Sequence, residues 1–280
     1  TILAMAFGSG LALYMFIVHA LTAPAPFVDV HLFKDRNFTV SMLIMFVIGI
    51  AVISPAVLVP GFLEQVKGYT PTQAGWLMAA RGAASILAMM LGVRLTARFG
   101  ARPTMALGIV LSTVSLLMMG QFGVDAQTNW FAFSTHMQGL GTTLTFMPLS
   151  LVAYATLPDR ARTEAGVLLT LIRNVGSSVG ISVVIALLAR SAQANAGHLV
   201  EYFSVFDLRR WVAVGQLPGP DAATVGLLGE IRRQALGIGY ANDFLRLAVC
   251  TVVTLPCVWL LRTPRTGARG AVSAAATSDH

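Results

Sequence analysis

Two arginines lie deep inside long apolar stretches, where a charged side chain is costly. Arg81 falls about eight residues into the apolar run 73–96, and Arg173 lies at a similar depth in the run 164–188. At 1.5 Å per residue of helix, Arg81 is roughly 12 Å from the start of its run, whereas a side chain that only anchors a helix would sit nearer its end. Because charges inside a membrane usually serve a function, we predict that both arginines lie in a substrate path or at a domain interface. Anchoring is the alternative.

Amide and acidic side chains add further candidates. Gln65, Gln138 and Asn174 lie in or beside apolar runs, and an amide in hydrocarbon needs a hydrogen-bond partner. They either bond between helices or line a polar substrate path. None of the twelve acidic residues lies in the middle of an apolar run. Glu64, just past the run 38–62, is the best local candidate for a proton site, with a solvated helix end as the alternative.

Glycines recur at a spacing that lets helices approach each other. Gly176 and Gly180 form a small-x-x-x-small face, and Gly139 and Gly141 form a similar one. Such faces bring helix backbones close together, so we predict helix packing, with sliding at a domain interface as a secondary role. The sequence has no Gly-x-x-x-x-Gly-Lys-Ser/Thr motif and no His/Cys/Glu cluster. No nucleotide, metal or other cofactor is therefore predicted.

The elements that must hold these residues are membrane helices. Of 280 residues, 56% are hydrophobic and only 11% are charged, whereas soluble domains carry about a quarter charged residues. A bilayer is the natural solvent for so much apolar surface. The net charge of +7 would suggest nucleic acid in a soluble chain. Here the basic residues sit between apolar runs, which favours topology-setting loops over a nucleic-acid partner.

The lengths of the apolar runs predict the fold class. A spanning helix needs about 20 mostly apolar residues, and the all-α membrane protein predicted here has seven such stretches: 1–21, 38–62, 73–96, 103–121, 130–157, 164–188 and 241–261. The segment 189–240 is predicted as a long loop outside the membrane, with short amphipathic helices at 198–214 and 222–235. The tail 262–280 is predicted to be disordered.

Basic residues predict the orientation of these helices. One side of the membrane receives the loops 22–37, 97–103 and 158–163 and the tail, while the short loops on the other side carry only Lys67. The nine basic residues of the first side are Lys34, Arg36, Arg98, Arg102, Arg160, Arg162, Arg262, Arg265 and Arg269. The positive-inside rule makes this side cytoplasmic and the inner (plasma) membrane the predicted location.

Four motifs in sequence order resemble one transporter family. Residues 24–37 (PAPFVDVHLFKDRN) are similar to the cytoplasmic linker of fourteen-helix drug antiporters. Residues 60–82 (PGFLEQVKGYTPTQAGWLMAARG), 138–148 (QGLGTTLTFMP) and 173–180 (RNVGSSVG) fit the same branch. This branch is the EmrB/QacA-type multidrug efflux family of the major facilitator superfamily, and the resemblance extends over about residues 1–262.

The resemblance implies a division of the chain. Residues 1–21 would be a linker transmembrane helix, 22–37 a cytoplasmic linker, and 38–261 the C-terminal six-helix domain, with the N-terminal half of the transporter missing. In the superfamily, the second and fifth helices of each domain line the contact between the halves. Arg81 and Arg173 fall on these helices. They would pair with carboxylates or carbonyls of the absent half, or hold a conformation at the rocking interface.

One stretch departs from the family's pattern. The loop after the second domain helix often carries a degenerate copy of Gly-x-x-x-Asp-Arg-x-Gly-Arg-Arg, and Ala97 stands here in place of the Asp. Arg98, Gly100 and Arg102 keep the cations and the turn. Without the carboxylate, a charge relay in this loop is not expected to gate transport, and topology anchoring is the alternative role.

The resemblance also implies a function. The protein would be part of a proton-coupled secondary transporter that exports lipophilic or cationic small molecules, such as drugs or antibiotics, by alternating access. The proton gradient would supply the energy, and the main proton carrier would lie in the missing half. Its partners would be the substrate, the bilayer and that half. The alternatives are an importer or lipid flippase of the same superfamily, an inactive half that serves as an assembly partner, and a membrane enzyme.

Overall fold

A computed structural model of the chain describes residues 2–22, 30–123, 127–202 and 220–261. These residues form seven long helices and one short 3₁₀ helix: α1 Ile2–Thr22, η1 Val30–Lys34, α2 Arg36–Gln65, α3 Pro71–Phe99, α4 Ala101–Gly120, α5 Thr128–Ala155, α6 Asp159–Tyr202 and α8 Pro220–Leu260. The predicted all-α class with seven long helices is confirmed. The predicted disordered tail lies outside the described residues.

Local capping chemistry explains where the bundle helices begin. The side chain of Asp35 accepts a hydrogen bond from the backbone N–H of Phe38 and caps α2, as short acidic side chains do at helix starts. Thr70 and Gln73 form a reciprocal capping box at the start of α3. Gly100 has φ of +91° and joins α3 to α4, a conformation that favours glycine.

Five of the described helical segments are long and apolar enough to cross a membrane: Arg36–Gln65, Pro71–Phe99, Ala101–Gly120, Ala161–His198 and Leu228–Leu260. α5 packs against α3 and α4. It buries polar side chains such as Ser134, Thr135 and Gln138. α5 therefore faces protein on several sides, which lets it carry polar side chains.

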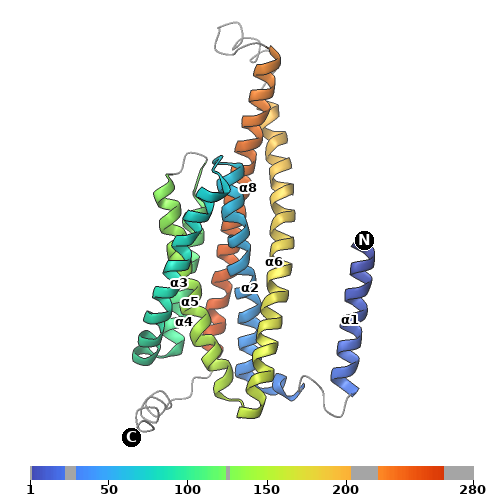
Figure 1. The fold of residues 1–280 in the computed structure, drawn as a ribbon, viewed down its shortest axis with the longest axis vertical. Helices are drawn as coiled ribbons and strands as arrows, with labels where there is room; N and C mark the ends of the chain where they lie inside the picture. The colour runs from blue at the N-terminus through green and yellow to red at the C-terminus, as the bar shows by residue number, and fades with distance from the viewer. Residues whose placement is uncertain (1, 23–29, 124–126, 203–219, 262–280) are drawn as a thin grey trace.

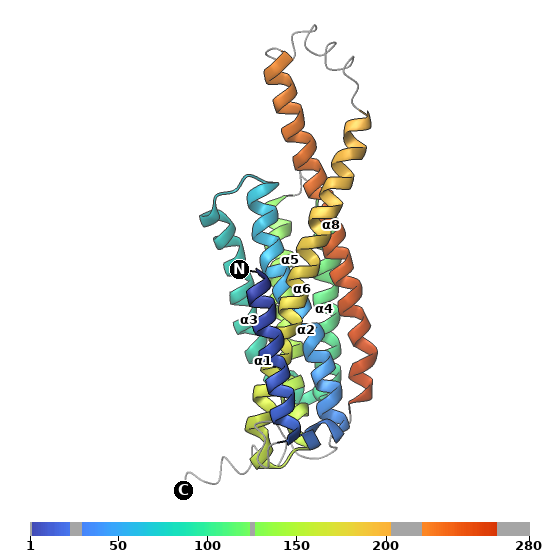
Figure 2. The same cartoon turned by 90° about the vertical axis from the view of Figure 1, so that its right-hand side faces the viewer.

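α6 and α8 are much longer than the apolar runs that predicted them. They have 44 and 41 residues, which corresponds to roughly 60–65 Å at 1.5 Å per residue, about twice the hydrocarbon thickness of a bilayer. Both project beyond the other helices at one end of the bundle (Figures 1 and 2). The prediction of a loop over 189–240 is therefore wrong for 189–202 and 220–240, which continue α6 and α8.

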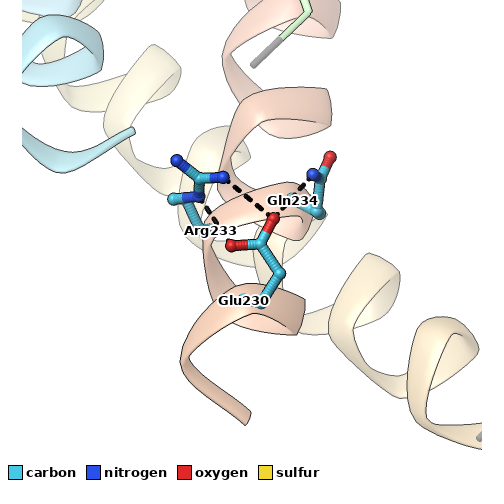
Figure 3. A network of polar contacts seen from close by, with 3 residues as sticks. All are labelled: Glu230, Arg233 and Gln234. Atoms are coloured by element: carbon cyan, nitrogen blue, oxygen red, sulfur yellow. Dashed lines mark hydrogen bonds and ion pairs between the residues drawn. The ribbon is translucent and has the colours of Figure 1, made fainter. Parts of the chain in front are cut away.

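The surface of this extension suits water. On α8, Glu230 accepts hydrogen bonds from Arg233 Nε at 2.8 Å and from Gln234 Nε2 at 2.8 Å (Figure 3). The ion pair between Glu230 and Arg233 is about half exposed. Side chains three or four residues apart are neighbours on a helix, and pairs of this kind stabilise a helix that is exposed to water. The helix thus continues where the hydropathy falls.

The bundle has two hydrophobic clusters, one toward each end of α2. The first includes Phe38, Met105 and Leu149. The second includes Phe62, whose ring stacks on that of Phe131 with centroids 5.0 Å apart. We call the end of the bundle at which α2, α4 and α6 begin the basic end, since the arginine-bearing turns lie there, and the opposite one the far end.

α1 stands apart from the six bundle helices (Figure 1). Several of its large apolar side chains are exposed, including Met5, Phe7 and Tyr14. The burial of functional side chains therefore depends on the remaining helices. Among these, α2 packs on α6 and α8, α5 packs on α3 and α4, and α4 packs on α8.

Candidate functional site

An open cavity with a volume of about 230 Å³ lies between α2, α3, α5 and α6. It is lined by apolar, hydroxyl-bearing and cationic side chains: Ile48, Val52, Arg81, Ser85, Thr142, Thr143, Phe146 and Arg173. The structure thus brings together the two arginines that the sequence singled out by their depth. None of the described residues that line this cavity is acidic.

Arg81 is held by a backbone carbonyl of a neighbouring helix. Its Nη2 donates a hydrogen bond of 2.8 Å to the carbonyl oxygen of Val52 on α2. This bond joins α2 to α3 and partly compensates for the loss of water around the guanidinium. An arginine carries five N–H donors, so the others are left for a partner in the cavity.

Arg173 is held by an aromatic ring instead. Its guanidinium carbon lies 5.6 Å from the ring centroid of Phe146 on α5, within the range of a cation–π interaction. Its Nε atom is buried and has no hydrogen-bond partner among the described residues. A buried donor without a partner is costly. The loss of water around the guanidinium is therefore compensated less well for Arg173 than for Arg81.

A close helix crossing lies beneath each arginine. At the α3–α5 crossing, a methyl group added to Gly139 would overlap the carbonyl oxygen of Arg81. The hydroxyl of Ser85 donates to that same carbonyl at 3.0 Å and lies 3.4 Å from the carbonyl of Gly139. Only glycine leaves room for this approach.

The α2–α6 crossing repeats this arrangement. A methyl group added to Gly49 would overlap the carbonyl oxygen of Arg173. The hydroxyl of Ser177 donates to that carbonyl at 2.8 Å and lies 3.3 Å from the carbonyl of Gly49. Each crossing therefore consists of an arginine, a serine four residues later and a glycine on the opposing helix. This similarity is what two related repeats, 38–121 and 130–261, would produce.

The other predicted packing glycines also lie at helix crossings. Gly176 faces the backbone of Phe46, and Gly180 faces the backbone of Ile50, both on α2. Gly141 faces Gly108 on α4. The sequence analysis missed Gly108 although it starts a small-x-x-x-small pattern with a serine. It also missed Gly49, which is a lone glycine among large apolar residues and has no such signal.

Gln138 is fully enclosed, with only 1% of its surface exposed. Neither atom of its side-chain amide has a hydrogen-bond partner among the described residues. It does not line the two-arginine cavity, although it precedes Gly139 at the α3–α5 crossing. The predicted role of Gln138 in a substrate path stays a prediction.

Three further candidates lie away from the cavity. Glu64 and Gln65 are exposed at the far end of α2, and Asn174 is exposed on α6 beside Arg173. The structure does not bring their side chains to the described cavity lining. The exposed position of Glu64 agrees with its alternative interpretation as a helix end.

The turn between α3 and α4 is tied to another helix. Arg102 Nη2 donates a hydrogen bond to the carbonyl oxygen of Leu261, next to the end of α8. The last carbonyls of a helix lack intrahelical partners, and a cation is favourable there. The guanidinium of Arg98 lies 5.4 Å from the ring centroid of Phe99. Arg102 therefore caps a helix, and Gly100 permits the turn.

One charged pair inside the bundle escaped the sequence analysis. Asp243 on α8 is 0% exposed, and its Oδ1 lies 2.5 Å from Nη1 of Arg246. Its Oδ2 has no partner among the described residues. Arg246 also approaches the hydroxyl of Ser191 on α6, at 3.5 Å. The sequence does hold a signal for this pair, because an acidic and a basic residue lie three positions apart within the last apolar run, 241–261.

Comparison with known proteins adds a family to this geometry. Residues 38–195 match the family model described as the Major Facilitator Superfamily. The matched segment is more than half of the 280-residue chain. It contains the arginines, the serines and the glycines of both helix crossings, as well as every residue that lines the two-arginine cavity.

Three bacterial relatives show how far the likeness extends. The colistin resistance protein EmrB of Acinetobacter baumannii is 26% identical over 86% of this chain and 49% of its own length. The fatty acid resistance protein FarB of Neisseria gonorrhoeae is 28% identical over 89% of this chain and 50% of its own length. For the multidrug export protein EmrB of Escherichia coli, the figures are 26%, 90% and 50%. The chain spans about half the length of the curated relatives it matches.

Proposed function

The chain belongs to the Major Facilitator Superfamily, and on this basis we propose that it forms the C-terminal half of a secondary transporter that exports lipophilic small molecules by alternating access. The family resemblance predicted from the four motifs is confirmed by the EmrB and FarB relatives. The chain is a multi-pass protein of the inner (plasma) membrane. Members of this superfamily are transporters rather than enzymes.

The two-arginine cavity is the observation that carries the proposal. Transporters of this kind hold their substrate near the bilayer midplane, between helices of related repeats. Arg81 and Arg173 lie on the second and fifth bundle helices, α3 and α6, and face one cavity between the two similar crossings. Charges at such a position are costly unless they serve substrate binding or conformational change.

The cavity is open on the side that α2, α3, α5 and α6 do not cover. The opposite wall is proposed to come from an N-terminal half, because relatives are about twice as long as this chain. α3 and α6 expose apolar side chains along their length, including Leu87 and Met90 on α3 and Val175 and Val179 on α6. Such surfaces need lipid or another helix to cover them. The rocking of the two halves would then open the cavity to either side of the membrane.

The energy source is proposed to be the proton gradient, which requires no cofactor. A proton carrier in a membrane path is usually a carboxylate or a histidine, and the described cavity lining contains neither. We therefore place the main carrier in the N-terminal half. The names of these relatives refer to colistin, fatty acids and multiple drugs, and they support an apolar or amphiphilic substrate for this protein.

Transport by the full-length protein in inside-out membrane vesicles tests this function. Acidification of the vesicle interior should drive uptake of a lipophilic dye, and a protonophore should abolish the uptake. Vesicles with an empty vector provide the baseline. Uptake that ignores the proton gradient would refute the coupling, and uptake only in right-side-out vesicles would identify an importer.

A further inference from the structure

We propose that the cavity between Arg81 and Arg173 binds the oxyanion headgroup of an amphiphile, whose apolar tail lies along the surrounding helices. This inference rests on the proposed transport function and specifies the class of substrate. The proposed ligand is an anion, whereas the family resemblance also allowed lipophilic cations as substrates.

The charge of the cavity is the first argument. Two guanidinium groups line one cavity of about 230 Å³. Among the residues that the structure describes, neither Arg81 nor Arg173 forms an ion pair with a carboxylate, and none of the described lining residues is acidic. Like charges in a medium of low dielectric constant repel each other strongly. A bound anion would offset this repulsion, whereas a cation would add to it.

The unused donors are the second argument. Arg81 uses Nη2 on the carbonyl of Val52, which leaves donors free on the rest of its planar group. The guanidinium of Arg173 lies near the ring of Phe146, and its buried Nε has no hydrogen-bond partner among the described residues. The planar donor group of an arginine matches the two oxygens of a carboxylate or phosphate.

The remaining lining suits an apolar tail. Ile48, Val52 and Phe146 supply apolar surface next to the arginines. The hydroxyls of Ser85 and Thr142 are occupied as donors by backbone carbonyls of their own helices, so they can offer only oxygen acceptors to a ligand. Acceptors do not bind an oxyanion, and the two arginines are the cationic groups of the described lining that would recognise its charge.

Three ligands with the same tail test the proposal. Laurate, dodecanol and dodecyltrimethylammonium differ only in the headgroup, so their affinities isolate the effect of charge. Binding to the purified full-length protein in nanodiscs of zwitterionic lipid can be measured by calorimetry. We expect laurate to bind at least about tenfold more tightly than dodecanol, as one charge-assisted hydrogen-bond pair would give. Dodecyltrimethylammonium should bind most weakly.

Substitution of the arginines supplies the matched arm of this experiment. The double variant Arg81→Gln/Arg173→Gln should lose the preference for laurate and keep the affinity for dodecanol. Arg94→Gln, which removes an exposed charge from the same helix as Arg81, should keep the preference. Unchanged laurate binding in the double variant would overturn the proposal and would favour pairing of the arginines with carboxylates of the other half.

An oxyanion with an apolar tail could come from the bilayer or from a transported compound. Nanodiscs that contain phosphatidylglycerol separate these sources. Competition with laurate would assign the site to an anionic lipid, and an unchanged laurate affinity would assign it to a transported amphiphile. Vesicle transport of a lipophilic cation together with tighter binding of that cation than of laurate would refute this inference and leave the proposed transport function intact.

Discussion

At the scale of single residues, the two cavity arginines have different partners. Arg81 ties α2 to α3 through the carbonyl of Val52, whereas Arg173 rests on the ring of Phe146 and keeps a buried donor free. Removal of either guanidinium eliminates a cavity charge, but only the removal of Arg81 also breaks a hydrogen bond between helices. The two positions are therefore expected to differ in their effect on conformational change.

We expect the Arg81→Ala substitution to abolish export while the protein still inserts into the membrane. Arg81→Ala in the full-length protein removes one cavity cation and the bond to Val52 but no fully buried apolar group. Export should fall to the baseline of the empty vector, while an immunoblot of the membrane fraction should show normal insertion. Arg94→Ala, an exposed position on the same helix, serves as the control and should transport normally. Normal export by Arg81→Ala would disprove a role in transport.

The ion pair of Asp243 and Arg246 leads to a prediction about stability. Arg246→Ala leaves the fully buried carboxylate of Asp243 without its described partner, and an uncompensated buried charge is strongly destabilising. The midpoint temperature of unfolding in detergent should therefore drop. The double variant Asp243→Asn/Arg246→Ala removes the charge as well and should recover part of the loss. A double variant less stable than the single one would contradict this account.

At the scale of helices, close backbone contact organises the bundle. Gly49 and Gly139 stand at equivalent crossings, each against the carbonyl of a cavity arginine. Small residues let membrane helices gain dispersion energy and short polar contacts that larger residues would prevent. The same contacts fix the backbone from which Arg81 and Arg173 extend. Packing and site geometry are thus determined by the same residues.

Alanine at the crossings should reveal this coupling. Gly49→Ala and Gly139→Ala each force a methyl group into a backbone carbonyl, and overpacking of this kind costs about 1–3 kcal/mol. Both variants should unfold at a lower temperature, which a thiol-reactive dye can monitor in detergent. Gly75→Ala is the matched control because its methyl group would meet open space in the same bundle. Equal midpoints for all three variants would show that the helices can shift apart without cost.

The helices illustrate how much the sequence predicts. Apolar runs located all seven, because transfer into lipid depends on composition over about 20 residues. The same signal failed over 189–202 and 220–240, since hydropathy records where a helix leaves the bilayer and not where it ends. Depth in the runs identified Arg81 and Arg173. The contact of Gly49 with the backbone of Arg173 and the complete burial of Asp243 depend on packing between distant segments, which only the folded structure reveals.

At the scale of the whole molecule, the chain has two unequal parts. The six-helix bundle carries the cavity, and the paired ends of α6 and α8 extend beyond it at the far end (Figures 1 and 2). A helix of 44 residues is longer than an ordinary bilayer is thick. Part of α6 must therefore extend beyond the membrane that it crosses. Because the basic end is predicted to be cytoplasmic, the extension should stand in water on the opposite side of the membrane.

Cysteine labelling can test this orientation. In a full-length variant whose Cys250 and Cys257 are replaced by alanine, single cysteines at Gln193, Arg232 and Arg98 would each occupy an exposed helical position. A membrane-impermeant maleimide should reach Gln193→Cys and Arg232→Cys in cells with a permeable outer envelope and an intact inner membrane, because roughly 50 Å of helix separates Gln193 from the start of α6. Arg98→Cys should react only after the inner membrane is opened. Labelling of Arg98→Cys in the intact state would reverse the topology, and protection of both extension sites would place the ends of α6 and α8 against another protein surface or within lipid.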